Sequence, residues 1–255
     1  MEESRFPARD GAELYYRIDG VGRPLILFSG LMGSGSPGLD PWAELFTGHG
    51  HSVIRPDFRG HGRSAKPHGA AYPPDVLVDD ALELIAHLGL ADGDYDLGGY
   101  SLGARVVLRM LVRGSRPGRA IAVAQGLEKV TGPQGDASRR ILEKLAGPGA
   151  VEPGSQEEQF GRWAEAQGAD VTALLLVLDS LVPTSETELR GIDVPTLIAI
   201  GDGDERSDAD ELAALLPNGV FLRVPGDHGT AFGSPELAAA MIEFLDGAAV
   251  SPGSG

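Results

Sequence analysis

The chain has 255 residues, a length that suits one large α/β domain or two small ones. Its net charge of −16 argues against nucleic acid and anionic membrane surfaces as partners, and the lack of cysteine excludes disulfides and a cysteine nucleophile. The N-terminus does not read as a signal peptide, and the longest apolar run is too short to span a bilayer. We therefore expect a cytoplasmic protein that acts on a small molecule, with its oligomeric state left open.

The N-terminal part of the chain alternates strand and helix patterns. A short helix is predicted over residues 40–46, with Asp40 as its N-cap and Pro41 at its first position. A longer helix is predicted over 75–88, because its apolar residues recur at intervals of three and four. Runs of β-forming residues predict strands at 13–18, 24–28 and 52–55.

A glycine-flanked serine stands between the next strand pattern, residues 95–98, and a helix pattern over 104–112. The pentapeptide Gly99-Tyr100-Ser101-Leu102-Gly103 matches G-x-S-x-G in the strand–turn–helix context that gives this motif meaning. Glycines let the strand and the helix pass closely, so that the hydroxyl stands clear beside the N–H groups of the helix N-terminus. We therefore interpret Ser101 as a nucleophile.

The C-terminal half contains further strand patterns and a long helical block in which no strand pattern occurs. Between about 126 and 190 the sequence shows only helical stretches separated by Pro-Gly breaks, at 137–145, 156–166 and 171–181. Around this block, strands are predicted at 119–124, 194–200 and 220–224, and helices at 208–216 and 235–245, the last with Ser234 as N-cap. The alternation predicts a single α/β domain over 1–255, with a doubly wound, mostly parallel sheet and the helical block as a lid insertion.

A serine nucleophile needs a base and an orienting carboxylate. His228 is the only one of the six histidines C-terminal to Ser101, and it follows the last predicted strand between glycines. For the acid we favour Asp204, because it lies beyond the turn after the 194–200 strand, where its side chain can bend back. Asp202 in the same loop and Glu128 after the preceding strand remain alternatives.

The tetrahedral intermediate of acyl transfer needs two preorganised N–H donors. The first is the backbone N–H of Leu102, the residue after the nucleophile. The second is expected from the glycine-rich loop 29–35, with Leu31 preferred and Met32 as the alternative. No phosphate-binding or dinucleotide-binding glycine pattern occurs in that loop.

Taken in order, these motifs resemble the α/β-hydrolase superfamily over about residues 13–245. The matching segments are Phe28-Ser29-Gly30-Leu31 as the oxyanion loop, Asp57 to Ser64 as the structural D-x-R-G-x-G-x-S loop, the pentapeptide around Ser101, Gly201-x-x-Asp204 and Pro225-Gly-x-His228. The family usually has His-Gly where this chain has Ser29-Gly30, so we expect altered packing of that loop.

This resemblance implies the α/β-hydrolase fold and a serine hydrolase without cofactor, in which Ser101 is the nucleophile, His228 the base and Asp204 the acid. Leu31 and Leu102 become the oxyanion donors, and the expected reaction is cleavage of a small or medium ester, thioester or lactone through an acyl-enzyme. A non-hydrolytic or ligand-binding protein on the same scaffold is the alternative.

Four further predictions concern residues without an assigned role in catalysis. The spacing of His49, His51, His61 and His68 does not suit a helical metal site, so we expect no metal and solvated imidazoles. Arg105 is expected to make a structural ion pair with an acid. Phe160, Trp163 and the run 174–178 are expected to line an acyl pocket, to pack the core of the lid, or both.

Overall fold

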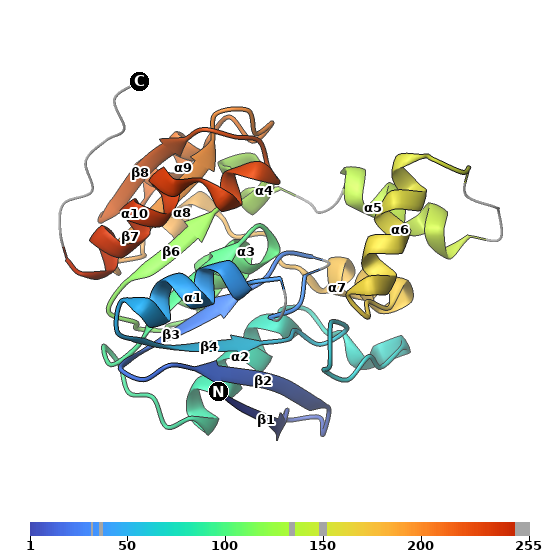
Figure 1. Cartoon of the computed structure of the whole chain (residues 1–255), viewed down its shortest axis with the longest axis horizontal. Helices are drawn as coiled ribbons and strands as arrows, with labels where there is room; N and C mark the ends of the chain where they lie inside the picture. Colours follow the sequence, from blue (N-terminus) through green and yellow to red (C-terminus); the bar gives the residue numbers. More distant parts are fainter. Residues whose placement is uncertain (32, 36–37, 133–135, 148–151, 248–255) are drawn as a thin grey trace.

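In a computed structural model of the chain, an eight-stranded sheet runs through the molecule (Figure 1). The structure describes residues 1–31, 33–35, 38–132, 136–147 and 152–247. The strand order is β1-β2-β4-β3-β5-β6-β7-β8, and only the β1–β2 and β2–β4 pairings are antiparallel. The strands are β1 (Glu2–Pro7), β2 (Glu13–Asp19), β3 (Arg23–Phe28), β4 (His51–Pro56), β5 (Asp96–Tyr100), β6 (Ala120–Val123), β7 (Thr196–Gly201) and β8 (Gly219–Val224).

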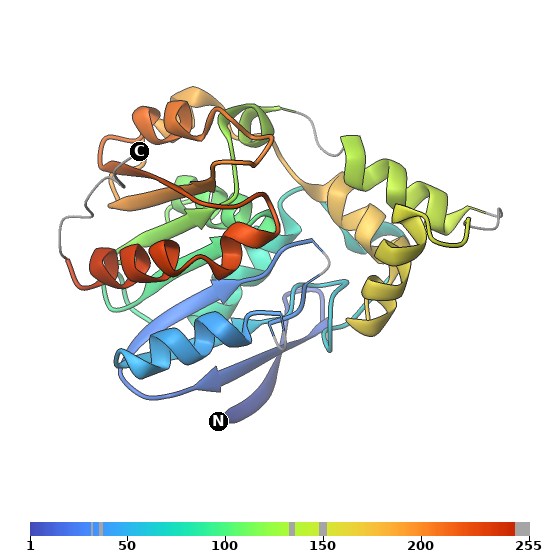
Figure 2. The same ribbon diagram turned by 45° about the horizontal axis from the view of Figure 1, so that its top comes forward.

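Helices cover both faces of this sheet (Figures 1 and 2). On one face lie α1 (Asp40–Gly48) and α10 (Pro235–Leu245), and on the other lie α2 (Val76–His87), α3 (Leu102–Val112) and α9 (Ala209–Leu215). Strand β3 shows why. Leu25 and Leu27 belong to the core that contains α1 and α10, whereas Ile26 and Phe28 belong to the core that contains α2, α3 and α9. Successive side chains of a strand point to opposite faces, so a continuous apolar run serves two helical layers. The predicted doubly wound fold is confirmed.

In the described part of the segment between β6 and β7, five helices are inserted. They are α4 (Leu127–Thr131), α5 (Asp136–Ala146), α6 (Gln156–Ala166), α7 (Val171–Ser180) and α8 (Glu186–Leu189). Helices α5 and α6 project from one side of the sheet (Figure 2). Ser155 and Asp170 cap α6 and α7 by accepting bonds from backbone N–H groups three residues on.

Helix α7 joins this insertion to the rest of the molecule. Its Ala173 and Val177 pack in the core that contains α2 and α3, whereas Leu174 and Leu178 pack with Leu142 of α5 and with Ala164 of α6. The insertion therefore has a small apolar core of its own beside the two cores of the sheet.

Two local predictions need correction. Strand β1 was not expected, because only Phe6 of its six residues is buried and an edge strand of this kind lacks an apolar pattern. Asp40 does not cap α1: it is the first residue of the helix, Leu39 precedes it, and its carboxylate pairs with the buried Arg55. Ser234 caps α10 as predicted, accepting a bond from the N–H of Leu237.

Candidate active site

Ser101 stands at the turn between β5 and α3 with φ 54° and ψ −110°, a strained conformation for a residue with a side chain. The flanking glycines permit the close approach that this turn requires. A Cβ on Gly99 would lie 2.3 Å from the carbonyl carbon of Gly103, and one on Gly103 would lie 2.2 Å from the carbonyl oxygen of Phe28. No other residue type fits at either position without moving backbone.

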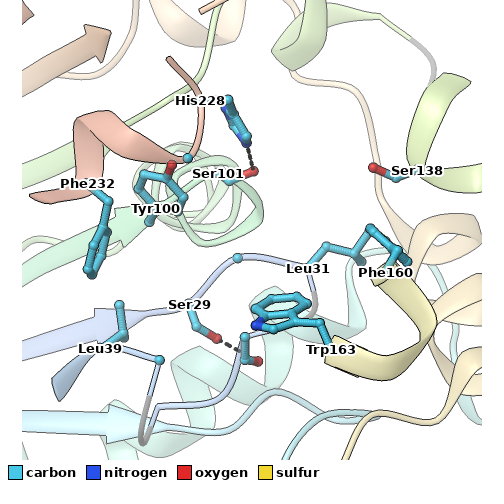
Figure 3. A pocket seen from close by; sticks show the side chains of 14 residues that line it. Ser29, Leu31, Leu39, Tyr100, Ser101, Ser138, Phe160, Trp163, His228 and Phe232 are labelled. Atoms are coloured by element: carbon cyan, nitrogen blue, oxygen red, sulfur yellow. Dashed lines mark hydrogen bonds between the residues drawn. The ribbon is translucent and has the colours of Figure 1, made fainter. Parts of the chain in front are cut away.

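The three residues predicted for the catalytic group lie in one hydrogen-bonded chain. The Oγ of Ser101 is 3.1 Å from Nε2 of His228, and Nδ1 of His228 is 2.7 Å from Oδ2 of Asp204. Figure 3 shows His228 reaching down to the hydroxyl of Ser101. They meet because β5, β7 and β8 are parallel, so the loops that follow them emerge at the same edge of the sheet.

The two alternative acids lie elsewhere. A carboxylate oxygen of Asp202 accepts a bond of 3.0 Å from the N–H of Gly226, which ties together the loops after β7 and β8. Glu128 is exposed in α4, and its backbone N–H donates to Asp208. Among the described residues, only Asp204 places a carboxylate on His228.

Arg206 was not singled out from the sequence, yet it contacts this group directly. Its Nη1 donates to Oδ1 of Asp204 at 2.9 Å, and its backbone N–H donates to the same oxygen at 3.1 Å. Burial acts to raise the pKa of Asp204, but the hydrogen bonds from His228 and from the Arg206 backbone outweigh it and lower the pKa to about 2. The carboxylate is therefore ionised at any pH near neutrality.

Nη1 of Arg206 also lies 2.8 Å from Nδ1 of His228. The neutral tautomer with its proton on Nδ1 donates to Asp204 and leaves Nε2 to accept the proton of Ser101. In that tautomer two N–H groups face each other, so the contact with Arg206 is electrostatic and is not a hydrogen bond. The charge of Arg206 therefore lies next to the ring nitrogen whose proton defines the tautomer.

The expected oxyanion donors come from two loops beside Ser101. Leu102 is the first residue of α3, where backbone N–H groups have no partner within the helix. Leu31 follows β3, and its carbonyl oxygen lies 2.6 Å from Nε2 of His61. Met32, the alternative donor, lies outside the described residues. The Oγ of Ser29 donates to the carbonyl of Gly33 at 3.1 Å, so this serine closes the loop where the family usually has histidine.

His61 and His51 are buried, which corrects the expectation that these histidines are solvated. Burial lowers the pKa of His61, whose ring holds the Leu31 loop through its carbonyl. His51 belongs to β4 and meets Phe46 edge to face. His49 and His68 are exposed as expected. In the part of the chain that the structure describes, no three histidine or acidic side chains gather closely enough to hold a metal ion.

Arg105 also differs from expectation. Its side chain is buried, and it donates to the carbonyl oxygens of Lys129 and, at 3.2 Å, of Val182. Within the described residues it makes no ion pair with a carboxylate. The reason is topological: α3 runs beneath the ends of α4 and α7, where carbonyl groups have no helical partner.

Two cavities meet at Ser101. The first, which we call the apolar cavity, has a volume of about 360 Å³ and is lined beside Ser101 and His228 by Leu31, Leu39, Tyr100, Phe160, Trp163 and Phe232. The second, which we call the polar cavity, has about 330 Å³ and includes Arg105, Glu128, Lys129, Arg140, Glu205 and Arg206. Ser138 of α5 borders both, and in Figure 3 it faces Ser101 across the opening.

The prediction for the apolar residues of the insertion therefore divides. Phe160 and Trp163 line the apolar cavity, Trp163 is nearly half exposed, and Phe160 also packs against the core of the insertion. Leu174 and Leu178 pack in the core of the insertion, and Leu178 also reaches the polar cavity. Leu39 and Phe232 had no signal in the sequence, since nothing local marks two residues 193 positions apart as neighbours across a cavity.

Comparison with known proteins defines the family. Residues 25–241 match the alpha/beta hydrolase family, and the chain belongs to it. More particularly, the chain is 30% identical to a non-heme haloperoxidase of Rhodococcus erythropolis over 272 aligned positions, covering 94% of this chain and 98% of the relative. A non-heme chloroperoxidase of Kitasatospora aureofaciens is 28% identical, covering 93% and 98% of the two chains.

Solved structures show the same fold at lower identity. A thermophilic esterase of Thermogutta terrifontis superposes with a TM-score of 0.74 at 23% identity, covering 97% of this chain and 99% of the esterase. A bromoperoxidase of Bacillus anthracis gives 0.74 at 23% identity, covering 95% and 100%. Among the described residues, no helix is both long and apolar enough to cross a bilayer.

Proposed function

We propose that this protein is a serine hydrolase that cleaves a small or medium carboxylic ester, thioester or lactone through an acyl-enzyme on Ser101. The observation that carries the proposal is the chain of hydrogen bonds from Ser101 through His228 to Asp204 at the mouth of an apolar cavity. Such a chain activates a hydroxyl that is a weak nucleophile by itself.

In the proposed reaction, Oγ of Ser101 attacks the carbonyl carbon and its proton passes to Nε2 of His228. The carbonyl oxygen becomes an oxyanion beside the N–H groups of Leu31 and Leu102. When the intermediate collapses, the bond from the carbonyl carbon to the leaving oxygen, or to sulfur in a thioester, breaks and His228 returns the proton to that leaving atom. Water then attacks the acyl-enzyme by the same steps, releasing the acid and regenerating Ser101.

The insertion acts as a lid in this proposal. Helix α6 supplies Phe160 and Trp163 to the apolar cavity, and α5 supplies Ser138 at the boundary of both cavities. Movement of these helices would change the width of the opening over Ser101, as lids do in many enzymes. No cofactor enters any step, and the cytoplasmic location stays a prediction.

Labelling with a fluorophosphonate tests the proposal directly. We expect one adduct on Ser101 by mass spectrometry, lost in Ser101→Ala and strongly slowed in His228→Ala and Asp204→Asn. Circular dichroism confirms that each variant is folded. A folded wild-type protein that takes no label and hydrolyses no ester in a graded panel would refute the hydrolase and favour the binding protein.

A peroxide-dependent oxidation of halide is a second candidate, favoured by the near full-length similarity to non-heme haloperoxidases. Hydrogen peroxide would be the oxidant and the halide the reductant. Bromination of a phenol dye in the presence of peroxide and bromide measures it. Loss of bromination in Ser101→Ala would link it to the same site, and equal rates in wild type and Ser101→Ala would exclude this candidate.

A further inference from the structure

We infer that the polar cavity is a subsite for an anion, so that the preferred ester carries a carboxylate on its acyl part. This inference rests on the proposed hydrolysis at Ser101, and it names the class of substrate. The inference comes from the charges, burial and unpaired atoms of the residues that line it.

Cationic side chains gather in the polar cavity although the protein as a whole carries a charge of −16. Four of its lining residues are basic and two are acidic, the acidic ones being Glu128 and Glu205. Asp204 pairs with Arg206, and among the described residues neither Arg105 nor Arg140 makes an ion pair with a carboxylate, Glu128 and Glu205 included. Both of these carboxylates are exposed, so water and salt screen them more than they screen a buried cation.

Arg105 is the buried cation. It is 3% exposed, its guanidinium donates only to carbonyl oxygens among the described residues, and burial lowers its pKa to about 10. The acid that acts on it most, Asp75, is already paired with Arg109 at 2.8 Å and with Arg113 at 3.2 Å. A positive charge in a low-dielectric site without its own carboxylate is costly, and an anionic ligand would offset that cost.

Arg206 offers a second feature that points to a ligand. Its Nε is buried and has no hydrogen-bond partner within the described structure, although Nη1 is bound to Asp204. Buried donors in proteins are nearly always paired, so an unpaired one beside a cavity indicates a missing acceptor. Arg140 adds a third cation from α5, exposed and without an ion pair among the described residues.

The position of His228 decides which half of the ester enters the polar cavity. The described lining of the apolar cavity includes His228, and that of the polar cavity does not. His228 must reach the leaving oxygen to protonate it, so the alcohol leaves on the side of the apolar cavity. The acyl group then extends past Ser101 into the polar cavity. A half-ester of a dicarboxylic acid with an apolar alcohol fits both cavities.

Three ester substrates separate the effect of the charge from that of the shape, and a charge on the acyl part from one on the alcohol. They are monobenzyl glutarate, benzyl glutaramate, which replaces the carboxylate by a neutral amide, and 4-carboxybenzyl valerate, which moves the charge to the alcohol. We expect kcat/KM for monobenzyl glutarate to exceed both others by about tenfold or more, as for a charge-assisted bond. Similar values for the glutarate and the glutaramate, or a preference for the carboxybenzyl ester, would overturn the inference. The amide oxygen of Gln125 has no hydrogen-bond partner in the described part of the chain, so a preference for the glutaramate would indicate a neutral polar subsite instead.

Arg140→Glu is the informative variant, because Arg140 is exposed and its replacement does not disturb a buried contact. We expect the ratio of kcat/KM for the glutarate to that for the glutaramate to fall by about tenfold or more. Arg162→Glu is the matched control: it makes the same charge change in the insertion, on a side chain that is 75% exposed and lies outside the lining. The control should leave the ratio unchanged, and equal effects of both variants would mean that only long-range charge matters.

Benzyl valerate and the fluorophosphonate label keep the two hypotheses apart. Labelling of Ser101 and turnover of benzyl valerate without a preference for the glutarate would refute only the anion subsite. Absence of both labelling and turnover would refute the hydrolase itself.

Discussion

At the scale of single residues, the site depends on charges held in fixed places. Asp204 is 6% exposed and receives hydrogen bonds on both oxygens, Oδ2 from His228 and Oδ1 from Arg206. These bonds stabilise the charged form more than burial destabilises it. Arg206 thereby fixes the orientation of a carboxylate whose other oxygen orients the imidazole.

Asp204 should therefore contribute to stability in a way that depends on pH. Its pKa is lowered from 3.8 to about 2 on folding, so its contribution is present above pH 3.8 and is lost as the pH falls towards 2. We expect the loss of unfolding free energy caused by Asp204→Asn to be about 2 kcal/mol greater at pH 5 than at pH 2. Urea denaturation of both proteins between pH 2 and 5 measures the difference, and a constant difference across that range would contradict it.

At the scale of elements, the junction of β5 with α3 determines where the nucleophile stands. The carbonyl of Phe28 at the end of β3 lies against Gly103, so the first turn of α3 rests directly on the neighbouring strand. The same contact brings the Leu31 loop, which follows Phe28, beside Ser101. One close approach therefore places both the serine and the loop expected to hold the oxyanion.

Gly103→Ala should disrupt this junction. The new Cβ would lie 2.2 Å from the backbone of Phe28, which no rotamer can relieve. We expect destabilisation of about 1–3 kcal/mol, as in overpacked cores, and loss of fluorophosphonate labelling. Gly48→Ala in α1 is the control, because nothing lies within 4 Å of its Cβ and alanine favours helix. Denaturant titration compares the two, and equal stabilities would show that the backbone at Gly103 shifts freely.

At the scale of the whole molecule, the sheet and the insertion are packed separately and share α7. The sheet is packed on both faces, with Leu97 of β5 fully buried beneath α3. Among the described residues, the core of the insertion contains four buried side chains, including Leu142. Cavities at Ser101 form where these two parts meet, so the shape of the site depends on how firmly the insertion is packed.

The same substitution in the two cores should have different effects. Leu97→Ala should lower the global free energy of unfolding by about 2–5 kcal/mol. Leu142→Ala should loosen α5–α7 with a smaller effect on the sheet, since regions with few buried contacts open locally. Hydrogen exchange followed by mass spectrometry distinguishes them. Protection lost equally in the sheet of both variants would show that the insertion and the sheet unfold as one unit.

Motifs with local geometry could be predicted from the sequence. Ser101 lies in a pentapeptide whose glycines permit the tight turn between strand and helix, so the motif itself predicts the turn. His228 and Asp204 follow segments with clear strand patterns. The two helical layers likewise follow from apolar runs such as residues 24–28. Strand β1 could not be predicted, because only Phe6 of its six residues is buried, so the strand lacks an apolar pattern.

Residues that act through distant contacts were beyond the sequence alone. Arg105 was expected to pair with an acid but donates to carbonyl oxygens of the insertion, and His61 was expected to be solvated but is buried against the carbonyl of Leu31. Arg140 of α5 and Arg105 of α3 line one cavity, although 35 positions separate them in the sequence. The sequence by itself determined the fold class and the order of the site motifs, since these depend on local periodicity and turn chemistry. Only the tertiary structure decided which acid faces His228 and what lines the two cavities, because burial and charge pairing depend on residues far apart in the chain.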